Sequence, residues 1–239
     1  MKTTKRILSF FLVFCMLMTC MPDTLVYAEE STFSGGSGTE NDPYLLANAT
    51  DFKKLATDVN GGTTYAGTYF MVPDSVTAPI ELSSEDGFVP IGNDTTNFQG
   101  TFDGNGKTIQ LSVDLTATSG GYAGLFGYAG TSSVVKNVTT TGTVKASDFV
   151  GGIAGKSQGK CINCHNEADV TSTATGEAYA GGVIGFAANI DSCTNRGSVS
   201  ASGKYVGGIT GFNNRSVESC INRGSVSSSG NDYVGGISG

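Results

Sequence analysis

The sequence predicts an all-β chain: a parallel β-solenoid resembling a right-handed β-helix, preceded by a small cap that contains one short helix. Three observations lead to this prediction: a repeat every 26 to 30 residues, short β-branched runs between Gly and Asn turns, and 35 glycines beside only 15% charged residues. Such a composition suits turns and strands or else disorder, so periodic apolar residues decide between them. The apolar residues are periodic, and repeats of this length indicate stacked coils.

The first 28 residues have the organisation of a secretory signal peptide. Lys2, Lys5 and Arg6 form a basic segment, residues 7–18 are apolar and uncharged, and residues 26–28 supply a small-residue cleavage site. A membrane anchor is one alternative, but the apolar run is shorter than the roughly 20 residues that span a bilayer. A lipoprotein acylated at Cys20 is another, although Thr19 is bulkier than the residue that usually precedes such a cysteine. We therefore expect a secreted or cell-surface protein, with no membrane insertion once the leader is removed.

Loss of this leader makes the chain more acidic. The sequence has 14 basic and 21 acidic residues, of which the leader holds three and one, so 11 and 20 remain and the mature net charge is about −9. A negative net charge argues against nucleic acid or an anionic membrane surface as a partner, because both carry negative charge themselves.

Residues 29–110 are predicted to form an N-terminal capping region. An apolar i, i+3, i+4, i+7 pattern is formed by Phe52, Leu55, Ala56 and Val59. Asn48 and Thr50 before it are candidate caps, and Gly61 and Gly62 follow it. These signals predict a helix over about residues 50–59. Strand-like runs follow at 69–72, 89–91 and 98–102. Such a cap would cover the first coil, whose open edge would otherwise pair with other chains.

The predicted solenoid occupies residues 111–239. One motif places an aromatic residue, glycine, an aliphatic residue and a closing glycine in that order, in segments 122–127, 149–155, 179–185, 205–211 and 233–239. The closing glycines recur at intervals of 28, 30, 26 and 28 residues. Because the last copy stops at its closing glycine, we expect a truncated solenoid that continues into further repeats or an anchoring domain.

A second motif alternates with the first and contains three apolar columns. They are Val135/Cys161/Ile190/Val217, Val138/Cys164/Cys193/Cys220 and Val144/Val170/Val199/Val226. Coils stacked at about 4.8 Å place like residue over like and form a continuous core. Asn166, Asn195 and Asn222 align near the corners, where asparagine tolerates left-handed backbone geometry. A propeller is the competing architecture, but its repeats usually run to about 40–50 residues.

Three segments of the sequence resemble motifs of a known family. Residues 124–127, Gly-Leu-Phe-Gly, match the motif that names the GLUG repeats of large secreted and surface proteins of bacteria, and residues 38–45 and 98–109 resemble the segments that lead into such repeats. The resemblance covers nearly all of residues 33–239. It implies a parallel β-helix-like stack in an adhesin-type protein, or in the non-catalytic part of an immunoglobulin A peptidase, and it brings no catalytic residues.

The cysteines raise three chemical alternatives. Residues 161–165, Cys-Ile-Asn-Cys-His, spell the haem-attachment pattern, but Cys161 lies in an aliphatic column and both cysteines are explained as small core residues. Zinc needs about four ligands, and one His beside core cysteines is a poor set. A disulfide within the column of Cys164, Cys193 and Cys220 stays open, because the coil spacing suits it. We expect no metal and no cofactor.

Residues 103–108 contain two further short motifs. Gly106-Lys107-Thr108 resembles the end of a phosphate-binding loop, but Thr101 stands where that loop needs glycine. Asp103 and Asn105 suggest calcium, yet no acidic residue follows at the spacing of an EF-hand. The Asp-Gly-Asn-Gly run therefore predicts a turn between two strands.

The aromatic column Phe149, Tyr179, Tyr205 and Tyr233 is predicted to face the core, because strand alternation puts each ring on the side of the aliphatic residue four positions later. The intervening glycines can break that parity, and outward rings could stack on sugars. A further column, Glu167, Arg196 and Arg223, predicts a solvated corner with one favourable pair.

Two classes of function follow. The first is a non-catalytic adhesion or scaffold module that presents its coils to a host or matrix glycan or protein. The second is a β-helical polysaccharide lyase or hydrolase. Glycoside hydrolysis needs two facing carboxylates about 5–9.5 Å apart. The repeats offer scattered acids: Asp148, Glu167, Asp169, Glu177, Asp191, Glu218 and Asp232. We expect the first class, with no catalytic residues.

Overall fold

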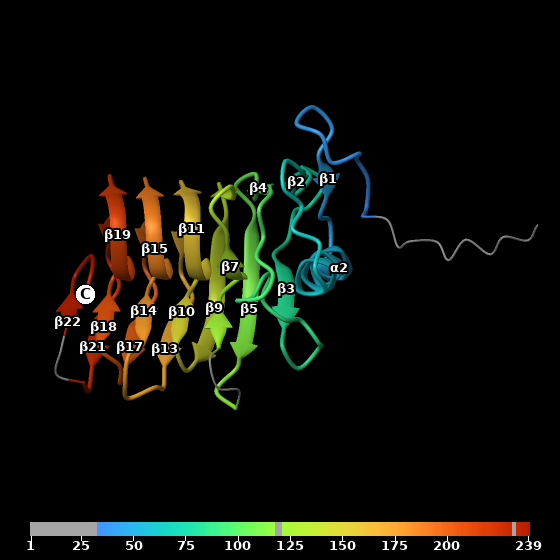
Figure 1. Cartoon of the computed structure of the whole chain (residues 1–239). Helices are drawn as coiled ribbons and strands as arrows, with labels where there is room; N and C mark the ends of the chain where they lie inside the picture. Colours follow the sequence, from blue (N-terminus) through green and yellow to red (C-terminus); the bar gives the residue numbers. More distant parts are fainter. Residues whose placement is uncertain (1–32, 118–120, 231–232) are drawn as a thin grey trace, which may run out of the picture. The chain divides into compact units, whose positions relative to one another are not determined.

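The computed structural model describes residues 33–117, 121–230 and 233–239, so the predicted signal peptide lies outside the described residues (Figure 1). Residues 33–239 form one unit, a parallel β-solenoid of about seven turns. The predicted fold class is confirmed. Within the described part of the chain, no helix has the length and apolarity that a membrane span requires.

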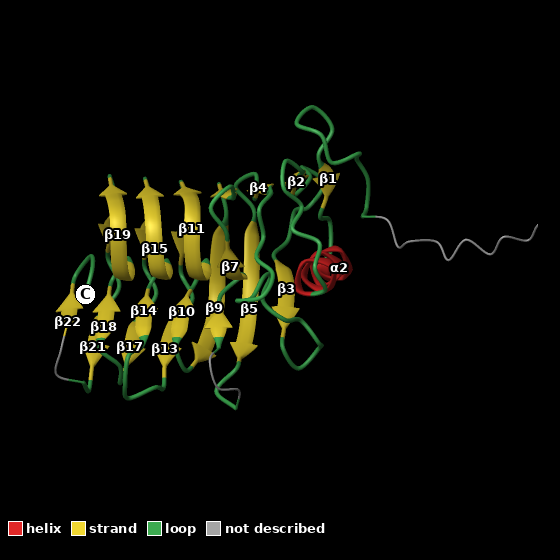
Figure 2. Cartoon of the chain, in the orientation of Figure 1, coloured by secondary structure: helices red, strands yellow, loops and turns green. Residues whose placement is uncertain are grey.

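Three sheets are built from strands of successive coils (Figures 1 and 2). The eight-stranded sheet has the order β1 (Tyr44–Leu45), β2 (Tyr69–Met71), β4 (Thr101–Asp103), β8 (Val134–Lys136), β11 (Ala154–Ile162), β15 (Ile184–Asp191) and β19 (Thr210–Glu218), with β7 (Phe126–Ala129) beside β11. The five-stranded sheet has the order β22 (Tyr233–Gly235), β18 (Tyr205–Gly207), β14 (Tyr179–Gly181), β10 (Phe149–Gly151) and β6 (Tyr122–Ala123).

The nine-stranded sheet has the order β20 (Ile221–Asn222), β16 (Thr194–Asn195), β12 (His165–Asn166), β9 (Thr139–Ala146), β13 (Asp169–Ser172), β17 (Val199–Ala201) and β21 (Val226–Ser228), with β5 (Thr108–Asp114) pairing both β9 and β3 (Ile80–Ser83). Neighbouring strands in all three sheets are parallel. One coil therefore lies on the next with its backbone groups paired along the stack.

The predicted apolar columns are confirmed by the register. Cys161 pairs with Val135 on one side and Ile190 on the other, and Val170 pairs with Val144 and Val199 in the same way. These side chains belong to a single buried apolar core that runs through the coils. Burial of apolar side chains on this scale is the main force that holds the stack together.

The helix, α2 (Ala49–Asn60), is close to its predicted bounds. Asn48 caps it: its side-chain oxygen accepts hydrogen bonds from the backbone N–H groups of Thr50 (2.9 Å) and Asp51 (3.2 Å). Phe52 is fully buried and meets Phe102 of the solenoid edge-on, with ring centroids 5.9 Å apart. The helix thus covers the N-terminal end of the stack, beside β3 (Figure 2).

The predicted boundary between a cap at 29–110 and a solenoid at 111–239 does not correspond to a break in the sheets. β5 runs across it, and β2 and β4 continue the eight-stranded sheet toward the N-terminus. The coils before residue 122 lack the glycine motif, and their core contains phenylalanines such as Phe70 and Phe98, whose ring centroids lie 5.9 Å apart. Phe98 in turn lies 5.1 Å from Phe126 in the first copy of the motif. Of the predicted strand runs, 89–91 forms only a bridge at Ile91, and Val89 is exposed.

The asparagine column has a different role from the one predicted. Asn166, Asn195 and Asn222 are absent from the left-handed backbone region, which is occupied by another column: Asn105, Asn137, Asn163, Ser192 and Ser219, with φ between 50° and 55°. Asn166 and Asn195 are instead fully buried, and their side chains form a hydrogen-bonded ladder. The Nδ2 of Asn166 donates to Oδ1 of Asn195 (2.8 Å), whose Nδ2 donates to Oδ1 of Asn222 (2.9 Å).

Candidate functional site

The aromatic column lies on the outer surface of the five-stranded sheet, so the prediction that it faces the core is wrong. Phe149, Tyr179 and Tyr205 are half-buried, whereas the residues that follow them, Val150, Ala180 and Val206, are fully buried. The backbone bends at residues 152–153, between β10 and β11. This bend breaks the strand alternation, so an aliphatic residue four positions later no longer shares the face of the ring.

The outward rings form a continuous stack. It consists of Tyr122, Phe149, Tyr179, Tyr205 and Tyr233, with successive centroids 4.8, 5.0, 4.9 and 5.1 Å apart and interplanar angles of 12°, 15°, 4° and 4°. Each inner ring has both faces covered by its neighbours. The stack therefore presents ring edges and phenolic hydroxyls to solvent, and it does not offer the ring faces on which sugars usually stack.

A second column lies beside this stack and was not predicted. It consists of Tyr128, Lys156, Phe186 and Phe212, which are register partners across β7, β11, β15 and β19. Phe186 meets Tyr179 of the stack edge-on, at 5.5 Å and 80°, and Phe212 meets Tyr205 in the same way. Tyr128 instead lies nearly parallel to Tyr122, at 5.9 Å and 19°. The Lys156 ammonium lies 4.6 Å from the centroid of Tyr128. A sequence signal for this column exists, because each member directly follows a closing glycine. We call the two columns together the aromatic face.

The tyrosine hydroxyls of the aromatic face are hydrogen-bonding groups. Partial burial, and then the neighbouring carboxylates Asp94 and Asp148, raise the pKa of Tyr122 above its ordinary value. Partial burial and then Glu177 do the same for the pKa of Tyr179. These two phenols therefore stay protonated near neutral pH and can both donate and accept hydrogen bonds to a ligand.

The cysteines form a compact cluster in the core. The Sγ atoms of Cys161, Cys164 and Cys193 all lie within 4.8 Å of one another, and the three residues are buried. Cys161 and Cys193 have their sulfurs 3.8 Å apart, and the four described cysteines, Cys220 included, are free thiols. Contact with Cys164 and Cys193, together with burial, raises the pKa of the Cys161 thiol well above its ordinary value. The predicted core role of Cys161 and Cys164 is confirmed.

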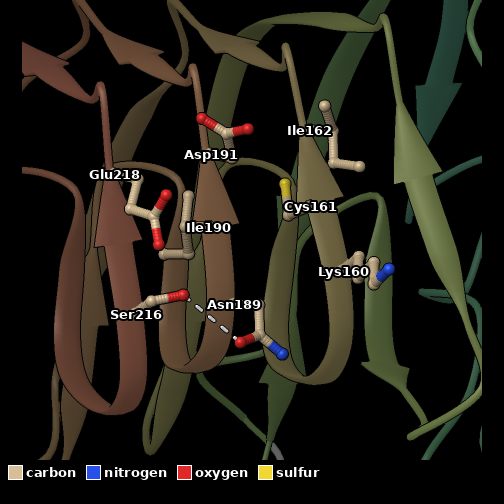
Figure 3. A pocket seen from close by; sticks show the side chains of 8 residues that line it. All are labelled: Lys160, Cys161, Ile162, Asn189, Ile190, Asp191, Ser216 and Glu218. Atoms are coloured by element: carbon tan, nitrogen blue, oxygen red, sulfur yellow. Dashed lines mark hydrogen bonds between the residues drawn. The ribbon is translucent and has the colours of Figure 1, made fainter.

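A pocket of about 330 Å³ opens on the eight-stranded sheet (Figure 3). Its lining residues are Lys160, Cys161, Ile162, Asn189, Ile190, Asp191, Ser216 and Glu218. Asp191 and Glu218 are register partners on neighbouring strands, both exposed, and the Ser216 hydroxyl lies 3.3 Å from Oδ1 of Asn189. The two carboxylates lie beside each other in one column, whereas a glycosidase pair flanks the scissile bond. Elsewhere on the surface, Arg196 Nη1 lies 2.9 Å from Glu167, which confirms the predicted stacked pair.

The predicted turn at residues 103–106 is confirmed, and it is held by Asp103. The Oδ1 of Asp103 accepts hydrogen bonds from the backbone N–H of Asn105 (2.8 Å) and from Nδ2 of Asn137 (3.0 Å), and its Oδ2 lies 3.1 Å from the Lys136 ammonium. Burial opposes ionisation, but these hydrogen bonds and the lysine lower the pKa of Asp103 below its ordinary value of 3.8. The carboxylate is thus engaged by groups of its own turn and of the next coil.

Acid should weaken this contact. A lowered pKa means that the folded state binds fewer protons than the unfolded chain, so the stabilisation is complete above pH 3.8 and is lost as pH falls through the folded pKa. We expect Asp103→Asn to lower the melting temperature near neutral pH and to have a shrinking effect below about pH 4. Thermal unfolding of both proteins across this range measures the difference. A gap in melting temperature that stays constant with pH would contradict the assignment.

Comparisons with known proteins show what the chain is similar to. No family model matches it. Halomucin of Haloquadratum walsbyi is 36% identical over 156 residues, 63% of this chain and 2% of the relative. A protein of Evansella cellulosilytica, provisionally named a Gly-rich membrane protein, is 33% identical over 141 residues, 57% of this chain and 16% of the relative. This chain therefore spans a small part of these relatives, both of them surface-type proteins.

One solved structure shares the architecture. The crystal structure of a protein from Bacteroides ovatus, provisionally named an immunoglobulin A1 protease, matches with a TM-score of 0.52 at 24% identity. The match covers 82% of this chain and 69% of that chain. At this identity the likeness shows a shared fold, since one fold hosts many functions.

Proposed function

We propose that this chain is a non-catalytic adhesion or scaffold module of a GLUG-type secreted or cell-surface protein, and that the aromatic face is its ligand-binding surface. The observation that carries the proposal is the outward stack of rings from Tyr122 to Tyr233, repeated at 4.8–5.1 Å on successive coils. The surface-type relatives support the location. A solenoid suits this role, because stacked coils create extended binding surfaces.

The chemistry of the aromatic face favours a glycan as ligand. Its tyrosine hydroxyls can donate and accept, as sugar hydroxyls can, and its ring edges supply apolar contact between them. Because the same residue types recur on each coil, a polymer of repeating units can make similar contacts along several coils. Many weak contacts of this kind add up to useful affinity through multivalency.

A conservative double variant tests the binding role. Tyr179→Phe combined with Tyr205→Phe removes two hydroxyls, and Phe149 already shows that phenylalanine fits in the stack. With about 1 kcal/mol per lost hydrogen bond, we expect affinity for a glycan bound by the wild type to fall at least about tenfold. A glycan array followed by titration of the purified protein measures this, and unchanged melting temperature shows that folding is intact.

Tyr69→Phe, a change of the same type on β2 and outside the aromatic face, serves as the matched control and should leave binding unchanged. Equal affinity of the wild type and the double variant would contradict the binding surface. Release of product from any glycan of the array, lost on Asp191→Asn, would contradict the non-catalytic role.

A further inference from the structure

We propose that the thiols of Cys161, Cys164 and Cys193 form a site for one thiophilic metal ion, of the class of Cu⁺, Zn²⁺ and Cd²⁺, in the core of the solenoid. This goes beyond the proposed surface function and is independent of it. The sequence predicts no metal site, because Cys161, Cys164 and His165 together are a poor ligand set. The fold instead adds a third sulfur from the next coil and leaves an all-sulfur set.

The spacing of the sulfurs suits one metal ion. Three thiolate sulfurs at about 2.3 Å from a common centre lie about 4 Å apart in a trigonal arrangement. The observed Sγ–Sγ separation of Cys161 and Cys193 is 3.8 Å, and all three sulfurs fall within 4.8 Å. Small side-chain rotations would therefore bring them onto one ion, without a change in the stack of coils.

The composition of the set selects the class of metal. Among the His, Cys, Asp and Glu side chains of the described residues, the cluster gathers sulfur donors alone. Soft thiolate ligands favour Cu⁺ and Zn²⁺ over hard cations such as Ca²⁺ and Mg²⁺. A backbone N–H also points at the cluster, since that of Cys164 lies 3.4 Å from Sγ of Cys193. Such donors stabilise a thiolate in a dry core.

One residue of the cluster departs from the repeat. Cys193 and Cys164 lie in a column that Val138 begins and Cys220 continues, whereas Cys161 stands among Val135, Ile190 and Val217. Cys161 thus brings the additional sulfur beside that column. Cys220, on the next coil, contacts Cys193 and is half-buried. Metal binding here breaks S–H bonds, and each coordinated thiol releases its proton to solvent.

The test uses Cd²⁺ as the probe, added to the reduced, purified protein without oxygen. We expect one equivalent to bind, with sulfur-to-metal charge-transfer absorption in the ultraviolet and a higher melting temperature. Cys161→Val should fold, because valine occupies the same column at 135 and 217, and should lower Cd²⁺ affinity at least tenfold with loss of the absorption. Cys220→Val, the control outside the set, should keep the affinity within about threefold.

Three results would overturn the proposal. The first is no stoichiometric absorption in the wild type. The second is affinity that survives Cys161→Val but is lost in Cys220→Val. The third is Cd²⁺ affinity that neither Cys161→Val nor Cys220→Val changes, because the ion would then bind elsewhere on the chain. An equal melting temperature of the metal-free wild type and Cys161→Val shows that the comparison concerns binding and not folding.

Discussion

Asn195→Ala is expected to lower the free energy of unfolding by at least about 3 kcal/mol, because several buried polar groups lose their partners at about 1–3 kcal/mol each. Asn195 is fully buried. It accepts from Nδ2 of Asn166 at 2.8 Å and donates to the carbonyl oxygen of Gly197 at 2.9 Å and to Oδ1 of Asn222 at 2.9 Å. An alanine at this position can form none of these hydrogen bonds. Urea-induced unfolding followed by circular dichroism measures the loss.

Asn222→Ala provides the matched control. Asn222 is the last described member of the ladder, and its side chain is only half-buried in this chain, so water can replace its partners. We expect a loss of about 1 kcal/mol, typical of a solvent-accessible hydrogen bond. Similar losses of unfolding free energy for Asn195→Ala and Asn222→Ala would show that burial does not increase the contribution of these hydrogen bonds to stability.

Gly181→Ala is expected to destabilise the solenoid by about 3 kcal/mol, at the upper end of the range for overpacking. An added Cβ would lie 2.6 Å from Cα of Thr210 on the next coil and would overlap the carbonyl oxygen of Ile184. Both obstacles are backbone: Ile184 begins β15 on the same coil, and Thr210 begins β19 on the next coil. They can move only if the bend between β14 and β15 opens and the two coils shift apart. Chemical denaturation of the variant measures the cost.

The control for this change is Gly176→Ala, in the connection between β13 and β14. A Cβ added there meets no atom within 4 Å, and its φ lies outside the left-handed region. We expect no loss, or a gain of up to about 1 kcal/mol from a less flexible unfolded chain. A loss at Gly176 equal to that at Gly181 would mean that glycine is needed for reasons other than close packing between coils.

Recurrence in the sequence was sufficient to predict the register of the later coils. Cys161 falls between Val135 and Ile190 because each coil must place apolar side chains over the same core. The helix at Ala49–Asn60 was predictable for a local reason, since Asn48 caps it and its apolar spacing is helical. Both predictions depend on patterns that lie within one repeat or one helix turn.

Features that depend on bends in the chain were not predictable in the same way. The side of the sheet to which Phe149 and Tyr179 point depends on how many residues form the bend at 152–153 and the equivalent bends. The alternation of side chains along a strand does not predict the length of these bends. The asparagine column was assigned to left-handed corners that Ser192 and Ser219 help to form. The thiol cluster was missed because Cys161 and Cys193 come from different columns, and only the fold shows that these two sulfurs are neighbours.

Parallel stacking of coils places a long stretch of chain within a short height. One repeat of 26 to 30 residues would extend to roughly 90–100 Å if pulled straight, yet it adds only about 4.8 Å to the height of the stack. Because the backbone hydrogen bonds of each coil point along the stack, a force applied at one end loads the outermost coil first. A surface tether of this design would yield one coil at a time. The contribution of each released coil to the length would grow about twentyfold, from about 4.8 Å to roughly 90–100 Å, which dissipates mechanical work before the attachment fails.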